Sequence, residues 1–453
     1  MTWYKPMFDP SRFAAGARKA EDLFRTIEQA VYDNKLAAGE QLPTVRALAE
    51  SLGINKNTVA AAYRMLIDSG VIVTAGRRGT VVAERHFATP VSITPPAMTP
   101  EGVIAVHDGN PDPAFLPTHA EILEAFATTA SPPRLYGERR NVADLTKWAT
   151  SMFEADLPTV HGIFISSGAL DAIERALRTH VRLGDKVAVE APTYMTTLAL
   201  VRSLGLRPVQ LEMDADGIRP DALKNALSSN CRAVIFSTRG QNPTGAVTGA
   251  RRARELRNAA RGHDDVLFID DDHSSLLELA PYEPWHVDSA RWLTVRSFSK
   301  FLGPDLRVSV TCGDSVTLGK LEYSQATSMG WVSSLLQQTA LALLKDDRVR
   351  TRIRHAGTAY RDRFVALKEG LHSIGVDVPG KVGLNVWIPL RDEATVVQWL
   401  LAKGWMVRSG SDFVVEGQAG IRVTSARLTT ERIEDFLSDF RELAIASSTT
   451  FSA

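Results

Sequence analysis

Apolar side chains recur at helical spacing in three successive segments near the N-terminus. The segment EDLFRTIEQAVYDN, which begins at Glu21, carries an apolar residue every three or four positions and predicts a first helix. The segment TVRALAESLG has the same period and closes on Gly53, a normal helix stop. In INKNTVAAAYRMLIDSG the period returns after Asn55, a residue type that caps helix N-termini. The pattern therefore predicts a compact helical block.

The connection between the second and third predicted helices is short. It consists of the Gly53–Ile54 turn, which is the spacing of a helix-turn-helix unit. The following segment, VIVTAGRRGTVVA, places short β-branched runs on both sides of a Gly-Arg-Arg-Gly tip and predicts a two-stranded wing. We therefore expect a winged helix-turn-helix domain over residues 15–84.

The helical period disappears after this block and a different pattern follows. The stretch ERHFATPVSITPPAMT is rich in proline and threonine and predicts a linker over residues 85–104. Further along, the strand-like runs VAVEA, AVIFS, VLFID and LTVRS alternate with helical runs such as LDAIERALRTHV and RRARELRNAAR. This alternation predicts an α/β fold, with a mostly parallel sheet covered by helices on both faces.

The last part of the chain predicts a smaller subdomain. From about Gly370 onward, the strand-like segments GLNVWIPL, MVRSG and IRVTS lie between helical segments, which is an α+β arrangement. We expect this subdomain and the parallel sheet to form one large effector-binding and dimerisation domain over residues 105–447.

Composition limits the classes of partner and compartment. Among 453 residues the basic and acidic side chains balance at 52 each, so contact with nucleic acid requires a local basic patch. The two cysteines, Cys231 and Cys312, lack CxxC spacing, which argues against a disulfide framework or a zinc site and fits a reducing cytoplasm. No apolar run approaches the ~18 residues of a membrane span, and MTWYKPMFDP lacks the layout of a signal peptide. We expect a soluble cytoplasmic protein without a membrane partner.

The helix-turn-helix segment contains such a local patch. Between Leu52 and Val82 one anion, Asp68, stands against four cations: Lys56, Arg64, Arg77 and Arg78. The side chains positioned to reach base edges or phosphates lie on two helices and the wing, and they are Arg46, Lys56, Asn57, Thr58, Arg77 and Arg78. The alternative is that these are solvated surface charges of an ordinary helical domain.

The order of residues in this segment resembles a known family. In GEQLPTVRALAESLGINKNTVAAAYRMLIDSGVIVTAGRRGTVV, the series Leu-Pro, Arg, Leu-Ala, Asn-Thr-Val, Tyr, Leu and Gly precedes a glycine-containing wing. It resembles the winged helix of the GntR family of bacterial regulators, which implies binding to double-stranded promoter or operator DNA. The family often carries arginine where Lys56 stands, and lysine cannot make the same planar fork to guanine.

A second motif, SFSKFLGPDLR, places Lys300 among apolar and hydroxyl neighbours. A lysine can hold an aldehyde cofactor as a Schiff base when a pocket desolvates its amine and lowers its pKa. Pyridoxal phosphate also requires an acid near its pyridine nitrogen, a donor to its ring hydroxyl, an aromatic face and a phosphate cup. The sequence contains candidates for each of these groups.

The candidates around the cofactor ring lie in three motifs. Asp271, in VLFIDDDH at the end of an apolar strand, is the carboxylate expected at the pyridine nitrogen, with Asp270 and Asp272 as rivals. Asn242, in QNPTG, can donate to the ring hydroxyl, and Tyr194, in EAPTY, can stack on the ring.

The candidates for anionic groups lie elsewhere. The segment ISSGALDAIERAL places Gly168 and Ala169 at a helix N-terminus, where free backbone amides bind phosphate. Three further side chains can complete that phosphate cup: Ser297, Ser299 and Arg307. Arg422, in GIRVTSARL, is a candidate fork for the carboxylate of a ligand.

Each of these motifs taken singly is common in proteins without a cofactor. In the order GNPDP, LYG, SSG, EAPTY, NPTG, IDDDH, SFSK and GIR, however, they resemble the aminotransferase-like fold of the aspartate aminotransferase type, over roughly residues 105–445. With the winged helix in front, the whole chain resembles the MocR subfamily of transcriptional regulators.

The resemblance implies a role for individual residues. Lys300 would hold the cofactor as a Schiff base, Asp271 its nitrogen, Tyr194 its face and Arg307 its phosphate. Tyr136, in RLYG, would reach the cofactor phosphate of the partner subunit, because these folds build their sites at a dimer interface.

The chain departs from the family at three positions. His273 stands where tyrosine is usual, so the donor to the ring hydroxyl would be an imidazole. Leu170 stands where glutamine is frequent, and Asp305 replaces a common glycine. These changes leave the effector open but not the cofactor.

The resemblance implies a homodimeric regulator that binds DNA and senses pyridoxal phosphate, together with an amino acid or amine as small-molecule effector. Control of vitamin B6 or amino-acid metabolism is the pathway expected from the family. The main alternative is an active aminotransferase with an appended DNA-binding module, because a sensor that exchanges Schiff bases needs the same lysine. A third is an architectural DNA binder whose large domain only dimerises.

Overall fold

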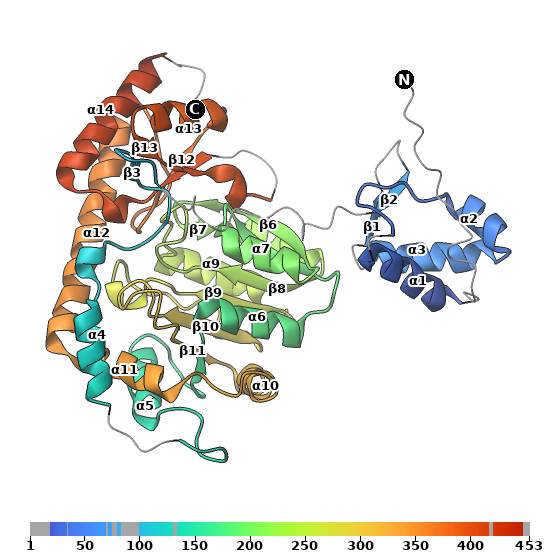
Figure 1. The fold of residues 1–453 in the computed structure, drawn as a ribbon, viewed down its shortest axis with the longest axis horizontal. Coiled ribbons are helices and arrows are strands. Elements are labelled where there is room, and N and C mark those ends of the chain that lie inside the picture. Colours follow the sequence, from blue (N-terminus) through green and yellow to red (C-terminus); the bar gives the residue numbers. More distant parts are fainter. Residues whose placement is uncertain are drawn as a thin grey trace. The chain divides into compact units, whose positions relative to one another are not determined.

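The computed structural model describes residues 19–33, 35–68, 71–74, 79–82, 99–129, 134–415 and 420–446. The chain divides into two compact units, one with the N-terminal helices and wing and the other with a large α/β body (Figure 1). Within those residues, no helix is both long and apolar enough to cross a membrane.

The N-terminal unit contains the three predicted helices, α1 (Ala20–Tyr32), α2 (Val45–Leu52) and α3 (Lys56–Asp68). The Thr44 hydroxyl caps α2 by accepting a hydrogen bond from the backbone amide of Ala47 at 3.2 Å. The helix ends at Gly53, which has φ 65° in the left-handed region. The helices bury one apolar face each, from Leu23, Ile27, Leu48, Val59 and Leu66. Strands β1 (Ile72–Thr74) and β2 (Thr80–Val82) pair antiparallel, so the predicted winged helix is confirmed.

The large unit is built on an eight-stranded mixed sheet with the order β4-β11-β10-β9-β8-β5-β6-β7. Its strands are β4 (Phe164–Ser166), β5 (Lys186–Ala191), β6 (Arg207–Asp214), β7 (Gly217–Ile218), β8 (Cys231–Phe236), β9 (Leu267–Asp271), β10 (Trp292–Ser297) and β11 (Ser309–Gly313). The pairs β5·β8, β8·β9 and β9·β10 are parallel, whereas β11 runs antiparallel to both of its neighbours. Because parallel neighbours need crossovers, helices lie between β5 and β8 and between β8 and β9 along the chain, whereas a loop with one 3-10 turn connects β9 to β10.

The helices of the large unit pack on the sheet and on one another (Figure 1). They are α4 (His119–Ala127), α5 (Ala143–Glu154), α6 (Ala169–His180), α7 (Met195–Ser203), α8 (Pro220–Ser228), α9 (Ala250–Ala260), α10 (Ser315–Ala326), α11 (Ser334–Lys345) and α12 (Asp347–Ser373). Helix α6 contacts β4, β11, β10 and β9, so it packs on the half of the sheet that ends at the β4 edge.

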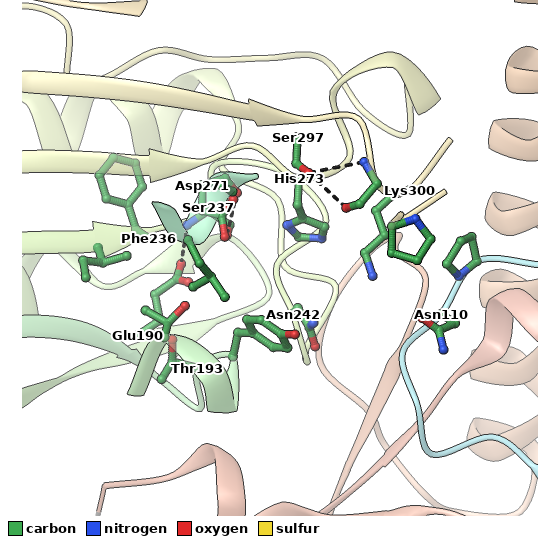
Figure 2. Close-up of a pocket in the computed structure, with 18 of the residues that line it drawn as sticks. Asn110, Glu190, Thr193, Phe236, Ser237, Asn242, Asp271, His273, Ser297 and Lys300 are labelled. Atoms are coloured by element: carbon green, nitrogen blue, oxygen red, sulfur yellow. Dashed lines mark hydrogen bonds between the residues drawn. The ribbon is translucent and has the colours of Figure 1, made fainter. Parts of the chain in front are cut away.

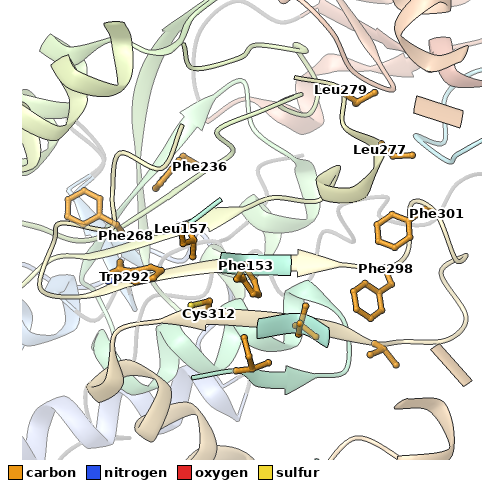
Figure 3. Close-up of a cluster of buried hydrophobic side chains, with 14 of the residues drawn as sticks. Phe153, Leu157, Phe236, Phe268, Leu277, Leu279, Trp292, Phe298, Phe301 and Cys312 are labelled. Carbon is orange, nitrogen blue, oxygen red and sulfur yellow. The ribbon is translucent and has the colours of Figure 1, made fainter. Parts of the chain in front are cut away.

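Large apolar side chains form a buried cluster around the central strands (Figure 3). Strand β10 contributes Trp292, the turn after it contributes Phe298 and Phe301, and α5 contributes Phe153. These side chains are almost completely buried, and such burial is the main stabilising contribution to a core of this size. The packing fixes the ends of β9 and β10, where the predicted cofactor residues lie.

The C-terminal subdomain packs against the C-terminal half of α12, through Phe364, Leu367 and Leu371. It contains β12 (Val386–Pro389), α13 (Glu393–Ala402), β13 (Trp405–Met406), β14 (Arg408–Ser409), β15 (Gly420–Val423) and α14 (Thr430–Ala446). Strand β3 (Ile104–Ala105) pairs in parallel with β13, so the segment that opens the large unit joins this subdomain. The predicted α+β arrangement is confirmed.

Candidate functional site

A cavity of about 220 Å³ lies at the carboxyl ends of the central strands (Figure 2). In open parallel sheets the ends of the strands leave such a crevice for ligands. Nine residues predicted from the sequence line it together: Ala169, Tyr194, Asn242, Asp271, His273, Ser297, Ser299, Lys300 and Arg307. Segments far apart in the sequence thus meet at one cavity.

Lys300 projects into the cavity from the turn that follows β10. Burial, together with the nearby charge of Arg422, lowers the pKa of its amine to about 8. More of the amine is therefore neutral near neutral pH than in an exposed lysine, and the neutral form is the one that acts as a nucleophile. In this structure Nζ donates a hydrogen bond to the carbonyl oxygen of Gly109 at 2.8 Å.

The three consecutive aspartates of IDDDH face different surroundings. Asp270 accepts three hydrogen bonds, two from Thr238 and one from the Tyr282 hydroxyl. Asp272 accepts from the guanidinium groups of Arg239 and Arg296. Because side chains alternate along a strand, Asp271 alone of the three lines the cavity.

Asp271 is a carboxyl group without its own partner. Its buried Oδ1 atom has no hydrogen bond among the described residues. Burial, and then the charges of Asp270 and Asp272, raise the pKa of this carboxyl to about 7, although Lys300 opposes the shift. Leaving a buried acceptor unpaired is costly, so the arrangement suits a ligand that supplies a proton or cation at this point.

His273 and Asn242 lie on the same side of the cavity as Lys300 (Figure 2). Burial and the charge of Lys300 lower the pKa of the His273 imidazole to about 4, so the ring is neutral at physiological pH. The side-chain oxygen of Asn242 accepts from Arg422 Nη1 at 3.3 Å, which leaves its NH₂ group as a donor.

A polar concavity forms where α6 begins. The Ser297 and Ser299 hydroxyls are 3.0 Å apart, and Arg307 Nη2 donates to the carbonyl of Ser167 at 2.9 Å. Gly168 caps α6 with φ 91°, and a Cβ atom there would collide with the Arg307 guanidinium. The guanidinium therefore lies directly against the helix N-terminus, whose free amides and partial positive charge attract an anion.

Three predicted residues lie outside the cavity lining: Gly168, which caps α6, and Arg422 and Tyr136. Arg422 is fully buried behind Asn242, and its Nη2 donates to the His107 carbonyl at 2.6 Å. Tyr136 is 93% exposed and contacts the ring of Trp331 edge-on at 5.5 Å. A single chain therefore does not bring Tyr136 to its own cavity.

Several cavity residues were missed by the sequence analysis. Glu190, Thr193 and Ser237 line it beside Asp271, and Asn110 lines it from the segment after β3. Burial raises the pKa of Glu190 well above its usual value. A glutamate at the end of the apolar run VAVEA was a usable signal, because strand ends at this edge carry the other site residues. Nothing in the local pattern placed Thr193 or Ser237 there.

The predicted DNA contacts are partly described. Lys56 and Asn57 are exposed at the start of α3, and Thr58 is half-buried. Arg46 on α2 is exposed and pairs with Glu50 at 3.0 Å. Arg77 and Arg78 lie outside the described residues.

Two family models match separate parts of the chain. The model described as bacterial regulatory proteins, gntR family, matches residues 19–82. The model described as aminotransferase class I and II matches residues 111–440.

Two curated transcriptional regulators align with most of this chain. The vitamin B6 salvage pathway transcriptional repressor PtsJ of Salmonella typhimurium is 36% identical over 432 residues, which cover 94% of this chain and 98% of PtsJ. The pyridoxine biosynthesis transcriptional regulator PdxR of Corynebacterium glutamicum is 26% identical and covers 77% of this chain and 78% of its own length. The solved structure of kynurenine aminotransferase from Pyrococcus horikoshii has a similar fold, with 20% identity and a TM-score of 0.69 over 80% of this chain and 94% of that chain.

Proposed function

The chain belongs to the MocR-type regulators, in which a gntR-family winged helix precedes an aminotransferase class I and II domain, and we propose that it is a transcriptional regulator controlled by pyridoxal phosphate. The winged helix binds operator DNA and the large domain binds the cofactor as its signal. The extensive similarity to PtsJ supports control of vitamin B6 metabolism as the regulated pathway. The protein would act in the cytoplasm, where its DNA lies.

Two independent observations support a fit of pyridoxal phosphate in the cavity. The unpaired Oδ1 of Asp271 faces a space that a protonated pyridine nitrogen would fill, and this observation carries the proposal. The packing of Arg307 against Gly168 forms a concavity for a phosphate dianion at the start of α6. A large domain that only dimerised would not need either feature.

The other cavity residues have complementary roles. When bound, pyridoxal phosphate supplies an aldehyde with which a lysine amine condenses, and the ring withdraws electrons from that carbon. Lys300 provides the amine, and its lowered pKa keeps part of it neutral. Neutral His273 and the Asn242 amide are the donors available to the ring hydroxyl, and Tyr194 offers an aromatic face.

Arg422 is the proposed site for the carboxylate of an amino-acid effector. It is a fully buried cation held by two neutral oxygens, of His107 and Asn242, and its Nε has no partner among the described residues. Burial, and then the charge of Arg408, lower the pKa of this guanidinium to about 10, although Tyr194, Asp108 and Asp412 oppose the shift. A ligand carboxylate would compensate the buried charge.

We propose a homodimer as the functional assembly. Leu135 and Tyr136 are 67% and 93% exposed in the single chain, and Leu123 on α4 is 66% exposed. Such large exposed apolar side chains are favourable in an interface. Tyr136 would then reach the cofactor phosphate held by the second copy.

The absorbance of the purified protein tests the cofactor proposal. We expect a band characteristic of lysine-bound pyridoxal phosphate, and we expect Lys300→Ala to lose it while keeping its far-ultraviolet circular dichroism. Borohydride reduction followed by peptide mapping should place the cofactor on Lys300. Attachment to a different residue would overturn the assignment.

A further inference from the structure

Residues 104–112, near the start of the large unit, are bonded to residues around the cavity. We call this segment the strap. Ile104 and Val106 donate backbone hydrogen bonds to Gly404 and Met406 at 2.7 and 3.0 Å, and Val106 accepts from Thr424 at 2.7 Å. These bonds attach the first part of the strap to the C-terminal subdomain. In the sequence, the strap comes directly after the segment that connects it to the winged helix.

The middle of the strap lies between two cationic side chains. Arg422 donates to the carbonyl of His107 at 2.6 Å, and Lys300 donates to the carbonyl of Gly109 at 2.8 Å. The amide of Gly109 donates to the Thr424 hydroxyl at 2.9 Å. The Lys300 bond thus ties the strap to the turn after β10, in addition to its bonds to the C-terminal subdomain and the ion pair of Asp112 with Arg363 on α12 at 2.9 Å.

Gly109 makes this close approach possible. Its φ is 69°, in the left-handed region that favours glycine, and a Cβ atom there would lie 2.9 Å from Arg422 Nη2. Gly109 is buried, so its carbonyl has little access to water if Lys300 turns away. A buried carbonyl that loses its donor is unfavourable unless the backbone moves to find another.

We propose that Lys300 is a latch that holds the strap through Gly109 in the cofactor-free protein and releases it when the amine is taken up by pyridoxal phosphate. This inference rests on the proposed function and adds the step by which the cavity acts on the chain leading to the winged helix. The residue that captures the signal is then also the residue that transmits it.

The chemistry of the amine requires this exchange. The nitrogen lone pair of neutral Lys300 forms a bond to the aldehyde carbon, and the aldehyde oxygen leaves as water with the two amine hydrogens. The nitrogen is then doubly bonded to carbon and keeps at most one N–H, after protonation. The amine hydrogens that Lys300 donates to the Gly109 carbonyl are thus lost or reduced to one, and the direction of a remaining N–H would be set by the bound cofactor and not by that carbonyl.

Two substitutions at Lys300 separate the latch from cofactor attachment. Lys300→Met has a side chain of similar length without a donor, whereas Lys300→Arg keeps donors for the Gly109 carbonyl. Neither carries the primary amine that condenses with the aldehyde. Both are compared with the full-length wild type by titrating operator DNA, with and without pyridoxal phosphate.

The latch predicts opposite results for the two variants without cofactor. Lys300→Met should bind the operator as the cofactor-loaded wild type does, and Lys300→Arg as the cofactor-free wild type does. Hydrogen–deuterium exchange of peptides from the strap should be faster in Lys300→Met than in Lys300→Arg. If Lys300→Met binds like the cofactor-free wild type and its strap exchanges no faster, the latch is wrong.

A second variant keeps the test decisive if Lys300→Met does not fold. Thr424→Val removes the partner of the Gly109 amide and leaves Lys300 in place, so it should shift cofactor-free operator affinity toward the loaded value. An unchanged affinity would overturn the proposal. Failure of the proposed function itself has a different signature: the wild type would show neither cofactor absorbance nor any response of operator affinity to pyridoxal phosphate.

Discussion

At the residue scale, the site depends on charges that the fold leaves without partners. Asp270 and Asp272 accept hydrogen bonds from several donors, whereas one buried oxygen of Asp271 has no partner in the part of the chain that the structure describes. Lys300 faces the same cavity and is turned to a backbone carbonyl. Such perturbed groups in one cavity are typical of a ligand site, because only a ligand can supply the missing partners.

The raised pKa of Asp271 makes the stability of the cofactor-free protein depend on pH. Its folded-state pKa of about 7 exceeds the ordinary value of 3.8, so between these values the folded state keeps a proton that the unfolded chain releases. The free energy of unfolding contributed by this group is therefore largest at acidic pH and falls as the pH rises toward 7. Each pKa unit corresponds to about 1.4 kcal/mol.

We expect Asp271→Asn to remove the fall in the free energy of unfolding that occurs as the pH rises toward 7. Chemical unfolding of the cofactor-free wild type and variant at about pH 5 and about pH 7 would measure it, and the advantage of the variant should grow toward the higher pH. The variant should also bind pyridoxal phosphate more weakly. A stability difference that is independent of pH would show that Asp271 ionises normally.

At the element scale, the first turn of α6 and the turn after β10 act together as an anion site. The helix must begin with a residue that lets Arg307 approach, and Gly168 satisfies this at a φ of 91°. A side chain at this position would strain the backbone as well as displace the guanidinium. The glycine therefore links helix geometry to phosphate binding.

Gly168→Ala should weaken pyridoxal phosphate binding by about tenfold or more, equivalent to at least about 1.4 kcal/mol. The matched control is Gly249→Ala, because Gly249 also caps a helix, α9, but has φ −88° and no atom within 4 Å of an added Cβ. Absorbance titration of both variants measures the difference. Equal affinities of the two variants for pyridoxal phosphate would show that the start of α6 does not bind the cofactor phosphate.

The start of α3 is the corresponding element for DNA. Lys56 and Asn57 are exposed there, and Arg46 is near enough to Glu50 to form a surface ion pair that costs little to break. Lys56→Ala or Arg46→Ala should weaken operator binding by about 1–3 kcal/mol if the contact is specific. Lys224→Ala, an exposed cation on α8, is the control in a gel shift. Unchanged affinity in both winged-helix variants would count against this surface.

At the scale of the whole molecule, we propose that one unit binds DNA and the other binds the cofactor. Such a protein regulates transcription only if cofactor binding changes the affinity for DNA. We expect saturation with pyridoxal phosphate to change operator affinity by about 1–3 kcal/mol, and Lys300→Ala to abolish the change without abolishing DNA binding. Fluorescence anisotropy with labelled operator measures both. Because the regulator should be a dimer, the operator should hold two half-sites separated by whole turns of ~10 bp.

A sensor of this kind needs occupancy and not turnover. We therefore expect no sustained production of keto acid when common amino acids are added to the loaded protein. Steady formation at ordinary enzyme rates, above roughly 1 per second, would instead favour the active aminotransferase.

The sequence alone determined the architecture and most of the cavity. Local spacing fixed the winged helix, because amphipathic helices and their caps are encoded within a few residues, as at Thr44 and Gly53. The order of motifs from EAPTY to SFSK pointed to Tyr194, Asn242 and Lys300, and all three line the cavity. These features depend on neighbouring residues or on the order of motifs along the chain, so they can be recognised in the sequence itself.

Tertiary structure decided what the pattern left open. The sequence offered three adjacent aspartates, and only the packing of β9 against its neighbours placed Asp271 toward the cavity and the other two toward arginine, threonine and tyrosine donors. Likewise, the bond from Lys300 to Gly109 joins residues far apart in the chain, and no local period records it. Contacts of this kind depend on how distant segments meet in space, and that is set by the folded core as a whole.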